Sequence, residues 1–136
     1  MSSKNNPLHC PCDTQRLYKN CCAIAHHQIN DVATAQQLMR SRYSAFVIGD
    51  IDFLQRSHHS SMRPSKKEAR EIKQWTQSVD WIKLEVLQTN KGLKNDLTGT
   101  VEFKAYFMEN GRVDVIHEHS RFCKENGHWV YLDAMV

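Results

Sequence analysis

Four of the five cysteines in this 136-residue chain lie within thirteen residues near the N-terminus. They form a Cys-x-Cys pair, Cys10 and Cys12, followed after eight residues by the adjacent pair Cys21 and Cys22. Zinc in structural sites takes four tetrahedral ligands, and thiolates at about 2.3 Å suit it. One tight turn can bring the first two sulfurs together, and the intervening segment lets the chain return with the other two. The spacing therefore predicts one structural Zn²⁺ held by these four cysteines.

The sequence alone leaves other arrangements of the cluster open. The thiols could be free and reduced, one pair could form a disulfide, or His9 or His26 could replace one cysteine, since mixed sites are common. A catalytic zinc is disfavoured because four protein ligands leave no open position for water. The fifth cysteine, Cys123, is expected to be a thiol of the core or of a cavity wall.

Composition indicates one main soluble domain with room for a small appendage. Hydrophobic residues make up 40% and charged residues 24% of the chain, and the net charge is +3. This basicity is too weak to indicate nucleic-acid binding, and Glu68 and Glu71 interrupt the one basic helix surface. The N-terminus is polar with no apolar segment after it, and no apolar run approaches about 20 residues. We therefore expect no signal peptide, no membrane span and a cytoplasmic location, where clustered cysteines bind metal more often than they form disulfides.

The chain divides into a metal-held segment, residues 1–28, and an α+β domain, residues 29–136. The first segment has too few apolar residues to build a core without a metal. In the second, Asp31 is expected to cap a helix that ends at Gly49, and Asp50 a shorter helix. Ser65 begins a capping box for a third helix that reaches about Thr76.

After these helices the hydrophobic period changes from that of a helix to that of a strand. The expected strands are residues 81–86, 101–107, 112–124 and 128–134. Asn110-Gly111 and Asn126-Gly127 are strong signals for two-residue hairpin turns, so neighbouring strands should pair antiparallel. Helices followed by an antiparallel meander predict the α+β class.

Ionisable and aromatic residues near the second hairpin are candidates for a pocket. Alternate residues of a strand share a face, so His117 and Glu118 are expected on opposite faces, and Trp129, Tyr131 and Asp133 on one face. Histidine and aspartate within reach of each other would permit acid–base chemistry. The candidate pocket residues are Arg40, Arg42, Tyr43, His117, Glu118, Trp129, Tyr131 and Asp133. Alternatively, the two arginines are structural and pair with Glu102, Glu118 or Asp133.

The cysteine segment resembles the SEC-C motif. The resemblance rests on Cys10-Pro11-Cys12, eight residues, Cys21-Cys22, with Tyr18-Lys19-Asn20 just before the pair. The motif is a short zinc-binding module that also occurs in the translocase motor SecA, where it engages protein partners. The usual motif has Gly-Ser-Gly after its second cysteine, whereas this chain has Asp13-Thr14-Gln15.

Four further blocks resemble the uncharacterised, bacterial YchJ-like family. They are residues 38–46 (LMRSRYSAF), 101–103 (VEF), 117–122 (HEHSRF) and 127–133 (GHWVYLD). The resemblance implies a central domain similar to nuclear transport factor 2, in which a curved antiparallel sheet wraps around helices to form a cone with a cavity. Members commonly carry a second SEC-C module at the C-terminus, and we expect only one in this sequence. The family implies no established reaction.

Two functions are therefore expected. The first is a binding module in which the zinc knuckle presents a surface to a protein partner. The alternative is a small-molecule-binding protein or an enzyme that uses the cavity of the cone. We favour binding over catalysis, because fold analogy alone does not establish a reaction.

Overall fold

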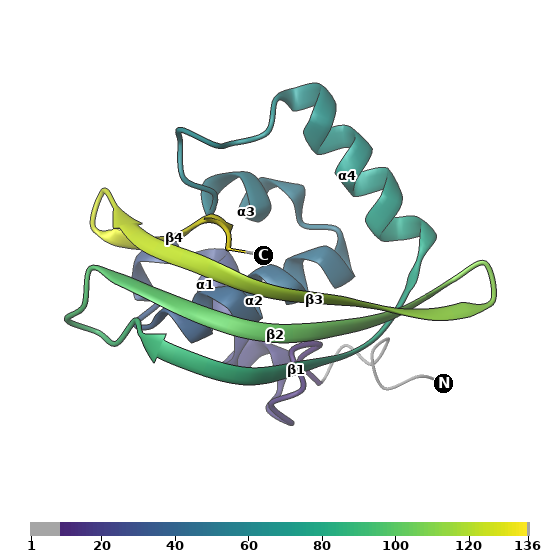
Figure 1. The fold of residues 1–136 in the computed structure, drawn as a ribbon, viewed down its shortest axis with the longest axis horizontal. Helices are drawn as coiled ribbons and strands as arrows, with labels where there is room; N and C mark the ends of the chain where they lie inside the picture. Colours follow the sequence, from purple (N-terminus) through teal and green to yellow (C-terminus); the bar gives the residue numbers. More distant parts are fainter. Residues whose placement is uncertain (1–8, 136) are drawn as a thin grey trace.

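The computed structural model describes residues 9–135, and its helices precede its sheet (Figure 1). The elements in chain order are the 3₁₀ turn η2 (Tyr18–Asn20), α1 (Cys22–His27), the 3₁₀ turn η3 (Ile29–Asp31), α2 (Ala35–Ile48), α3 (Ile51–Arg56), α4 (Lys66–Ser78), β1 (Asp80–Lys91), β2 (Thr98–Glu109), β3 (Arg112–Glu125) and β4 (His128–Ala134). Within this part of the chain, no helix is both long and apolar enough to cross a membrane.

The four strands form one antiparallel sheet in the order β1-β2-β3-β4. The sheet curves across α1 and α2, which lie on one side of it, and α4 lies apart from these two helices (Figure 1). Helix α2 packs on the sheet through β1, β2 and β4, while α4 packs on α2 and α3. The predicted α+β class, with helices followed by an antiparallel meander, is confirmed.

Local signals set most of the element boundaries. Gly49 ends α2 with φ of 80°, a left-handed conformation that glycine adopts without strain. The Asp50 side chain accepts a hydrogen bond from the third residue of α3, and Ser65 forms the expected capping box with Glu68, although α4 continues to Ser78. The expected cap of α2 is wrong. Asp31 belongs to the preceding 3₁₀ turn, and Thr34 is the cap, because its side chain accepts a bond from the backbone three residues on.

Both predicted hairpin turns are present. Asn110 and Gly111 have φ of 53° and 77°, and Asn126 and Gly127 have φ of 55° and 83°. Two successive positive φ angles give the type I′ turn, whose twist matches that of the flanking strands.

The core lies between α2 and the concave face of the sheet. In β2 the buried residues alternate strictly with less buried ones, and this row consists of Gly99, Val101, Phe103, Ala105 and Phe107. Trp129 of β4 is fully buried, and its Nε1 donates to the Ala33 carbonyl at 3.0 Å. A register shift opposite Arg121 and Phe122 breaks the regular pairing of β3 with β4, so side chains beyond it change face.

Candidate functional site

The structure brings the four clustered cysteines together around one point. Their Sγ atoms all lie within 4.8 Å of one another, and those of Cys12 and Cys21 are 3.5 Å apart. Four sulfurs at about 2.3 Å from a tetrahedral zinc would be about 3.8 Å apart, so the arrangement fits that ion after small adjustments. Cys10, Cys12 and Cys22 are buried, and Cys21 is partly exposed.

The loop after Cys12 has the backbone that glycine would favour, although it contains none. Asp13 and Gln15 both have φ of 64°. These are the first and third residues of the Asp13-Thr14-Gln15 segment, where the usual SEC-C motif has glycine. A left-handed conformation costs a residue with a Cβ roughly 1–2 kcal/mol. Asp13 and Gln15 therefore adopt this conformation at some cost in strain.

The side chains of Asp13 and Thr14 make contacts around the cysteine cluster. Asp13 Oδ2 accepts a hydrogen bond of 2.6 Å from the backbone N–H of Leu84 in β1. Thr14 Oγ1 lies 3.4 Å from Cys12 Sγ and 3.2 Å from Cys21 Sγ. Asp13 thus connects the cysteine loop to the edge strand of the sheet, and Thr14 supports the sulfurs.

Helix α2 holds the cysteine loop from the other side. Arg40 Nη1 donates to the Cys12 carbonyl at 2.7 Å, and Ser44 Oγ lies 3.5 Å from Cys10 Sγ. His26 is not a ligand, because its Nδ1 pairs with the Tyr18 hydroxyl at 2.6 Å and its Nε2 with the Ser41 carbonyl at 2.7 Å. The knuckle is therefore packed into the fold.

Crowding of the thiols affects their titration. Hydrogen bonds with Cys12 and Cys22 lower the pKa of the Cys10 thiol, and hydrogen bonds with Cys10 and Cys12 raise the pKa of the Cys22 thiol. Metal binding requires thiolates, so it would release protons from the cluster.

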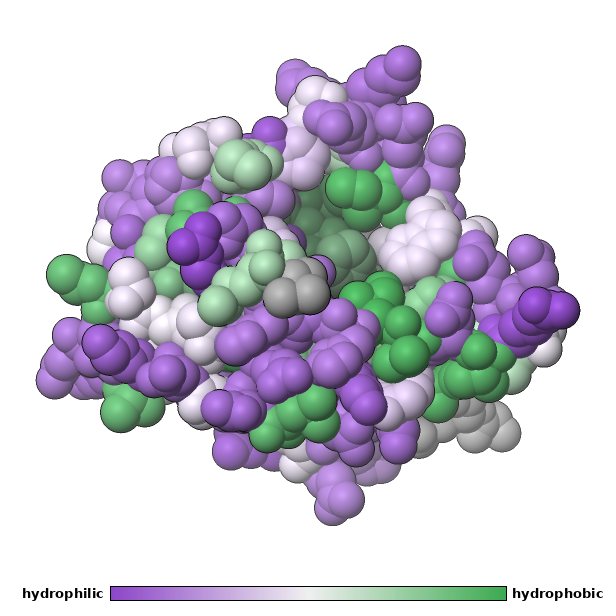
Figure 2. Space-filling model, viewed as in Figure 1, coloured by the Kyte–Doolittle hydropathy of each residue, from purple (hydrophilic) through white to green (hydrophobic). Residues whose placement is uncertain are grey.

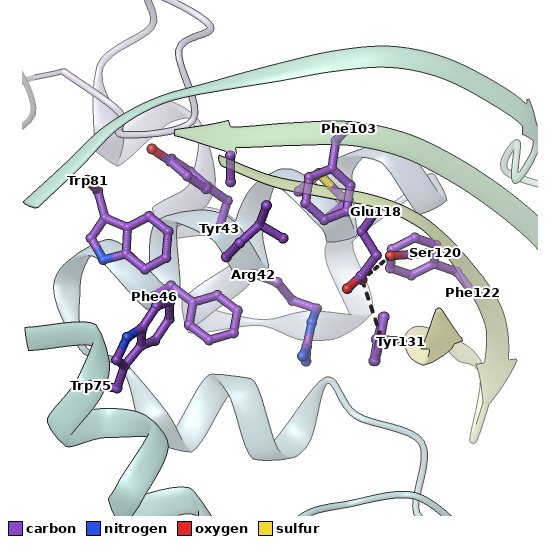
Figure 3. Close-up of a pocket in the computed structure, with 13 residues that line it drawn as sticks. Arg42, Tyr43, Phe46, Trp75, Trp81, Phe103, Glu118, Ser120, Phe122 and Tyr131 are labelled. Atoms are coloured by element: carbon purple, nitrogen blue, oxygen red, sulfur yellow. Dashed lines mark hydrogen bonds between the residues drawn. The ribbon is translucent and has the colours of Figure 1, made fainter. Parts of the chain in front are cut away.

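A cavity of about 250 Å³ lies between α2, α4 and the concave face of the sheet. Aromatic side chains form much of its wall, and a smaller polar group lies at one end (Figure 3). The labelled aromatic residues of the wall are Tyr43, Phe46, Trp75, Trp81, Phe103 and Phe122; the polar group consists of Arg42, Glu118, Ser120 and Tyr131. In the view of Figure 1 the surface is hollowed between α4 and β3, and hydrophobic residues line the hollow (Figure 2).

The aromatic wall is held in place by contacts between its own rings. Trp81 meets Trp75 edge to face at 5.5 Å between ring centroids, and Tyr43 edge to face at 5.7 Å. The Trp81 indole N–H also donates to the Thr76 carbonyl at 3.2 Å. Edge-to-face pairs contribute about 0.5–1.5 kcal/mol each beyond burial, so this wall is preformed.

Arg42 is fixed at the polar end of the cavity. Its Nη1 donates to the Leu54 carbonyl at 3.0 Å and to Ser57 Oγ at 2.7 Å. The guanidinium carbon lies 4.8 Å from the centre of the Tyr131 ring, which adds a cation–π contact. Burial lowers the pKa of Arg42 to about 10, with Tyr131 and Glu118 opposing the shift, so the group stays charged at neutral pH.

Glu118 faces the same space from β3. Its Oε2 accepts hydrogen bonds from Ser120 Oγ at 2.5 Å and from the Tyr131 hydroxyl at 3.4 Å. Burial raises the pKa of Tyr131 to about 12, which keeps the phenol protonated as a donor. Among residues 9–135, no ion pair joins Glu118 to Arg42.

Four of the eight predicted pocket residues line this cavity: Arg42, Tyr43, Glu118 and Tyr131. The other four lie elsewhere. Arg40 supports the cysteine loop, and Trp129 is buried with its indole bonded to Ala33. His117 is on the convex face, where its Nε2 lies 2.7 Å from Glu102 Oε2.

Asp133 also lies on the convex face, where Arg121 donates to both of its carboxylate oxygens. The expectation that Asp133 shares a face with Trp129 and Tyr131 is wrong, because the register shift in β4 reverses the alternation. The proposed pairing of histidine and aspartate in one pocket therefore does not occur.

Sequence reasoning missed several wall residues. Ser120 is two residues from Glu118 on β3 and Phe103 is the direct partner of Glu118 on β2, so counting the register from the predicted hairpin turn could have found both. Phe46 and Trp75 come from two different helices, and no sequence signal indicates that these approach the sheet at one place.

Comparisons with known proteins agree with this geometry. A family model described as the middle nuclear transport factor 2-like domain of YchJ matches residues 34–134. A UPF0225 protein of Vibrio parahaemolyticus is 46% identical over 125 residues, which cover 92% of this chain and 73% of that protein. A UPF0225 protein of Bordetella pertussis is 37% identical over 134 residues, which cover 97% of this chain and 96% of that protein.

Two solved structures are similar over most of the chain. The solution structure of a SEC-C motif containing protein from Rhodopseudomonas palustris has a TM-score of 0.79 at 28% identity and covers 94% of this chain and 98% of its own. The crystal structure of a SEC-C motif containing protein from Psychrobacter arcticus has a TM-score of 0.76 at 30% identity, with coverage of 94% and 82%.

Proposed function

The chain belongs to the YchJ-like UPF0225 family, with a SEC-C motif and a nuclear transport factor 2-like domain, and we propose that it binds a small organic molecule in the cavity of that domain. One observation carries the proposal. The concave face encloses about 250 Å³ with aromatic walls and a few converging polar groups at one end. Ligand sites typically have this composition, with apolar walls for affinity and a few placed polar groups for orientation.

The zinc knuckle has a structural part in this proposal. The four cysteines would hold one Zn²⁺ in a closed tetrahedral set, which leaves no position for a substrate. Arg40 and Asp13 connect the knuckle to α2 and β1, two elements that also form the cavity wall. A bound ion would therefore help to hold α2 and β1 in the positions that form the cavity wall. Thiolate ligands of this kind require a reducing compartment, so a cytoplasmic location forms part of the proposal.

Binding is favoured over catalysis by the chemistry of the wall. In the described part of the chain, the residues that line the cavity include no histidine, cysteine or lysine. The one carboxylate, Glu118, is already held by Ser120 and Tyr131.

A filled cavity tests the proposal. Ala105 lines the cavity and is 3% exposed, so Ala105→Phe should occupy part of the space. Its neighbour Tyr106 lies on the opposite face, and Tyr106→Phe is the matched control. We expect native mass spectrometry to detect a small molecule on protein purified from its source cells and on the control, but not on Ala105→Phe. Equal retention by Ala105→Phe, or none by the wild type, would contradict the proposal.

A second candidate role is capture of a protein partner by the knuckle. Leu17 and Ile24 are 37% and 47% exposed, which places two apolar side chains on the surface of the cysteine segment. A groove of about 410 Å³, lined mainly by polar residues from the knuckle and α2, includes Ile24. Affinity capture with wild type and with Leu17→Asp/Ile24→Asp, which leaves all four cysteines in place, tests this role. A partner retained equally by both forms would contradict it.

A further inference from the structure

One edge of the Arg42 guanidinium, formed by Nε and Nη2, makes no hydrogen bond within the described residues. Both hydrogen bonds that this group makes come from Nη1, to Leu54 and Ser57. Its Nε and Nη2 have no hydrogen-bond partner among residues 9–135. Neither atom is sealed in protein, because no buried side-chain nitrogen or oxygen in that range lacks a partner. These two nitrogens therefore keep some exposed surface, and Arg42 is one of the residues that line the cavity.

The cavity does not supply a bonded counter-ion for this charge. The nearest acidic group of the wall, Glu118, forms no ion pair with Arg42 and is instead held by Ser120 and Tyr131. Charged groups withdrawn from water are normally paired, because desolvation costs several kcal/mol without a partner. The polar end of the cavity thus has an open position for an anion.

Elsewhere in the same protein, this edge of an arginine is filled by a carboxylate. Arg121 Nε and Nη2 donate to Asp133 Oδ1 and Oδ2 at 2.6 and 2.5 Å. The planar fork of guanidinium matches a carboxylate with two parallel hydrogen bonds, and charge-assisted bonds of this kind are about twice as strong as neutral ones.

Resting on the proposed function, we propose that the cavity's occupant is a small aromatic carboxylic acid, with its carboxylate on the Nε and Nη2 edge of Arg42 and its ring against the wall that Phe46, Trp75 and Trp81 form. The volume of about 250 Å³ lies below that of sites for drug-sized molecules, which suits an acid of one or two rings. The wall's indole and phenyl faces supply the apolar contact, as Figure 3 shows on the side of Arg42 opposite Glu118.

Glu118 makes the site selective. Its carboxylate repels the acid group of the ligand, and no residue in the described range bonds to its Oε1. A hydroxyl or amino group on the carbon next to the ligand's carboxylate can donate to this oxygen and offset the repulsion. Aromatic acids with such a group should therefore bind more tightly than the plain acid.

The test uses phenylacetate, its α-hydroxyl derivative mandelate and indole-3-acetate, each compared with its uncharged amide. Binding is followed by saturation-transfer NMR and by tryptophan fluorescence. We expect the amides to bind at least tenfold more weakly than the acids, and Arg42→Lys, which keeps the charge but loses the fork, to weaken acid binding at least tenfold. Arg121→Lys on the convex face is the matched control and should leave the affinity unchanged.

Arg42→Lys also loses hydrogen bonds to Leu54 and Ser57 and could disturb the fold, so a second variant tests the inference with Arg42 in place. Glu118→Gln keeps an acceptor for Ser120 and Tyr131 and removes the negative charge, so it should tighten binding of phenylacetate at least threefold. Amides that bind as well as acids, or Glu118→Gln that weakens acid binding, would overturn the inference about ligand class while leaving the cavity as a binding site. Acids that fail to bind the wild type would overturn it too, and native mass spectrometry of the purified protein then decides the proposed function separately.

Discussion

Replacing Asp13 by glycine should destabilise the protein, whereas the same change at Gln15 should stabilise it slightly. Both residues have φ of 64°, so glycine removes a similar strain at each position, about 1 kcal/mol. Glycine also makes the unfolded chain more flexible, which costs about 0.5 kcal/mol at each. Only Asp13 has a further contact to lose, its hydrogen bond to the backbone of Leu84. That bond is charge-assisted but partly exposed, so we assign it about 2 kcal/mol.

The net changes have opposite signs. Asp13→Gly should lower the free energy of unfolding by about 1.5 kcal/mol, and Gln15→Gly should raise it by about 0.5 kcal/mol. In a domain of this size, the difference of about 2 kcal/mol separates the two melting temperatures by roughly 6 °C. Calorimetry at one fixed excess of zinc measures both, because bound metal shifts apparent stability. Equal shifts in the same direction would refute the reasoning that Asp13 connects the loop to the sheet.

Three further predictions follow from individual contacts. Cys21→Ser should lower the zinc content below one ion per chain by elemental analysis and reduce the melting temperature, because it removes one of four ligands. Trp129→Phe should cost about 1 kcal/mol in urea unfolding, since it removes the hydrogen bond to the partly buried Ala33 carbonyl; no measurable change would contradict that bond. Burial and the charge of Arg42 lower the pKa of His58 to about 4 in the folded protein, against about 6.5 in the unfolded chain. Between these two pH values the unfolded chain binds more protons than the folded protein. The free energy of unfolding should therefore fall as the pH falls from 6.5 towards 4. His58→Gln should remove this pH-dependent loss of stability, which we put at on the order of 1 kcal/mol because partial exposure of His58 weakens the effect. A pH profile of stability that His58→Gln leaves unchanged would contradict this.

The sequence predicts the fold well where the signal is local. The hairpin turns depend on Asn110 and Asn126 followed by glycine, and both have the positive φ that the type I′ turn requires. The capping box at Ser65 and the left-handed end of α2 at Gly49 are equally local. The N-cap of α2 was predicted wrongly at Asp31 because several residues before the helix are able to cap it. The 3₁₀ turn that contains Asp31 depends on tertiary packing.

The candidate site was harder to predict than the fold. The cysteine cluster could be predicted because its members are close in sequence. The cavity is built from α2, α4 and all four strands, and Trp75 reaches it only because α4 packs on α2. Asp133 was misplaced because a register shift between β3 and β4 has no sequence signal of its own.

The three tryptophans give the most direct test of the central claim that the cavity binds a small aromatic acid. Trp75 and Trp81 line the cavity, whereas Trp129 is buried elsewhere with its indole N–H on Ala33. In a two-dimensional ¹H–¹⁵N NMR titration with mandelate, the indole signals of Trp75 and Trp81 should shift together and saturate, and that of Trp129 should stay in place. Indole signals that do not move, or that all shift equally without saturating, would contradict the claim.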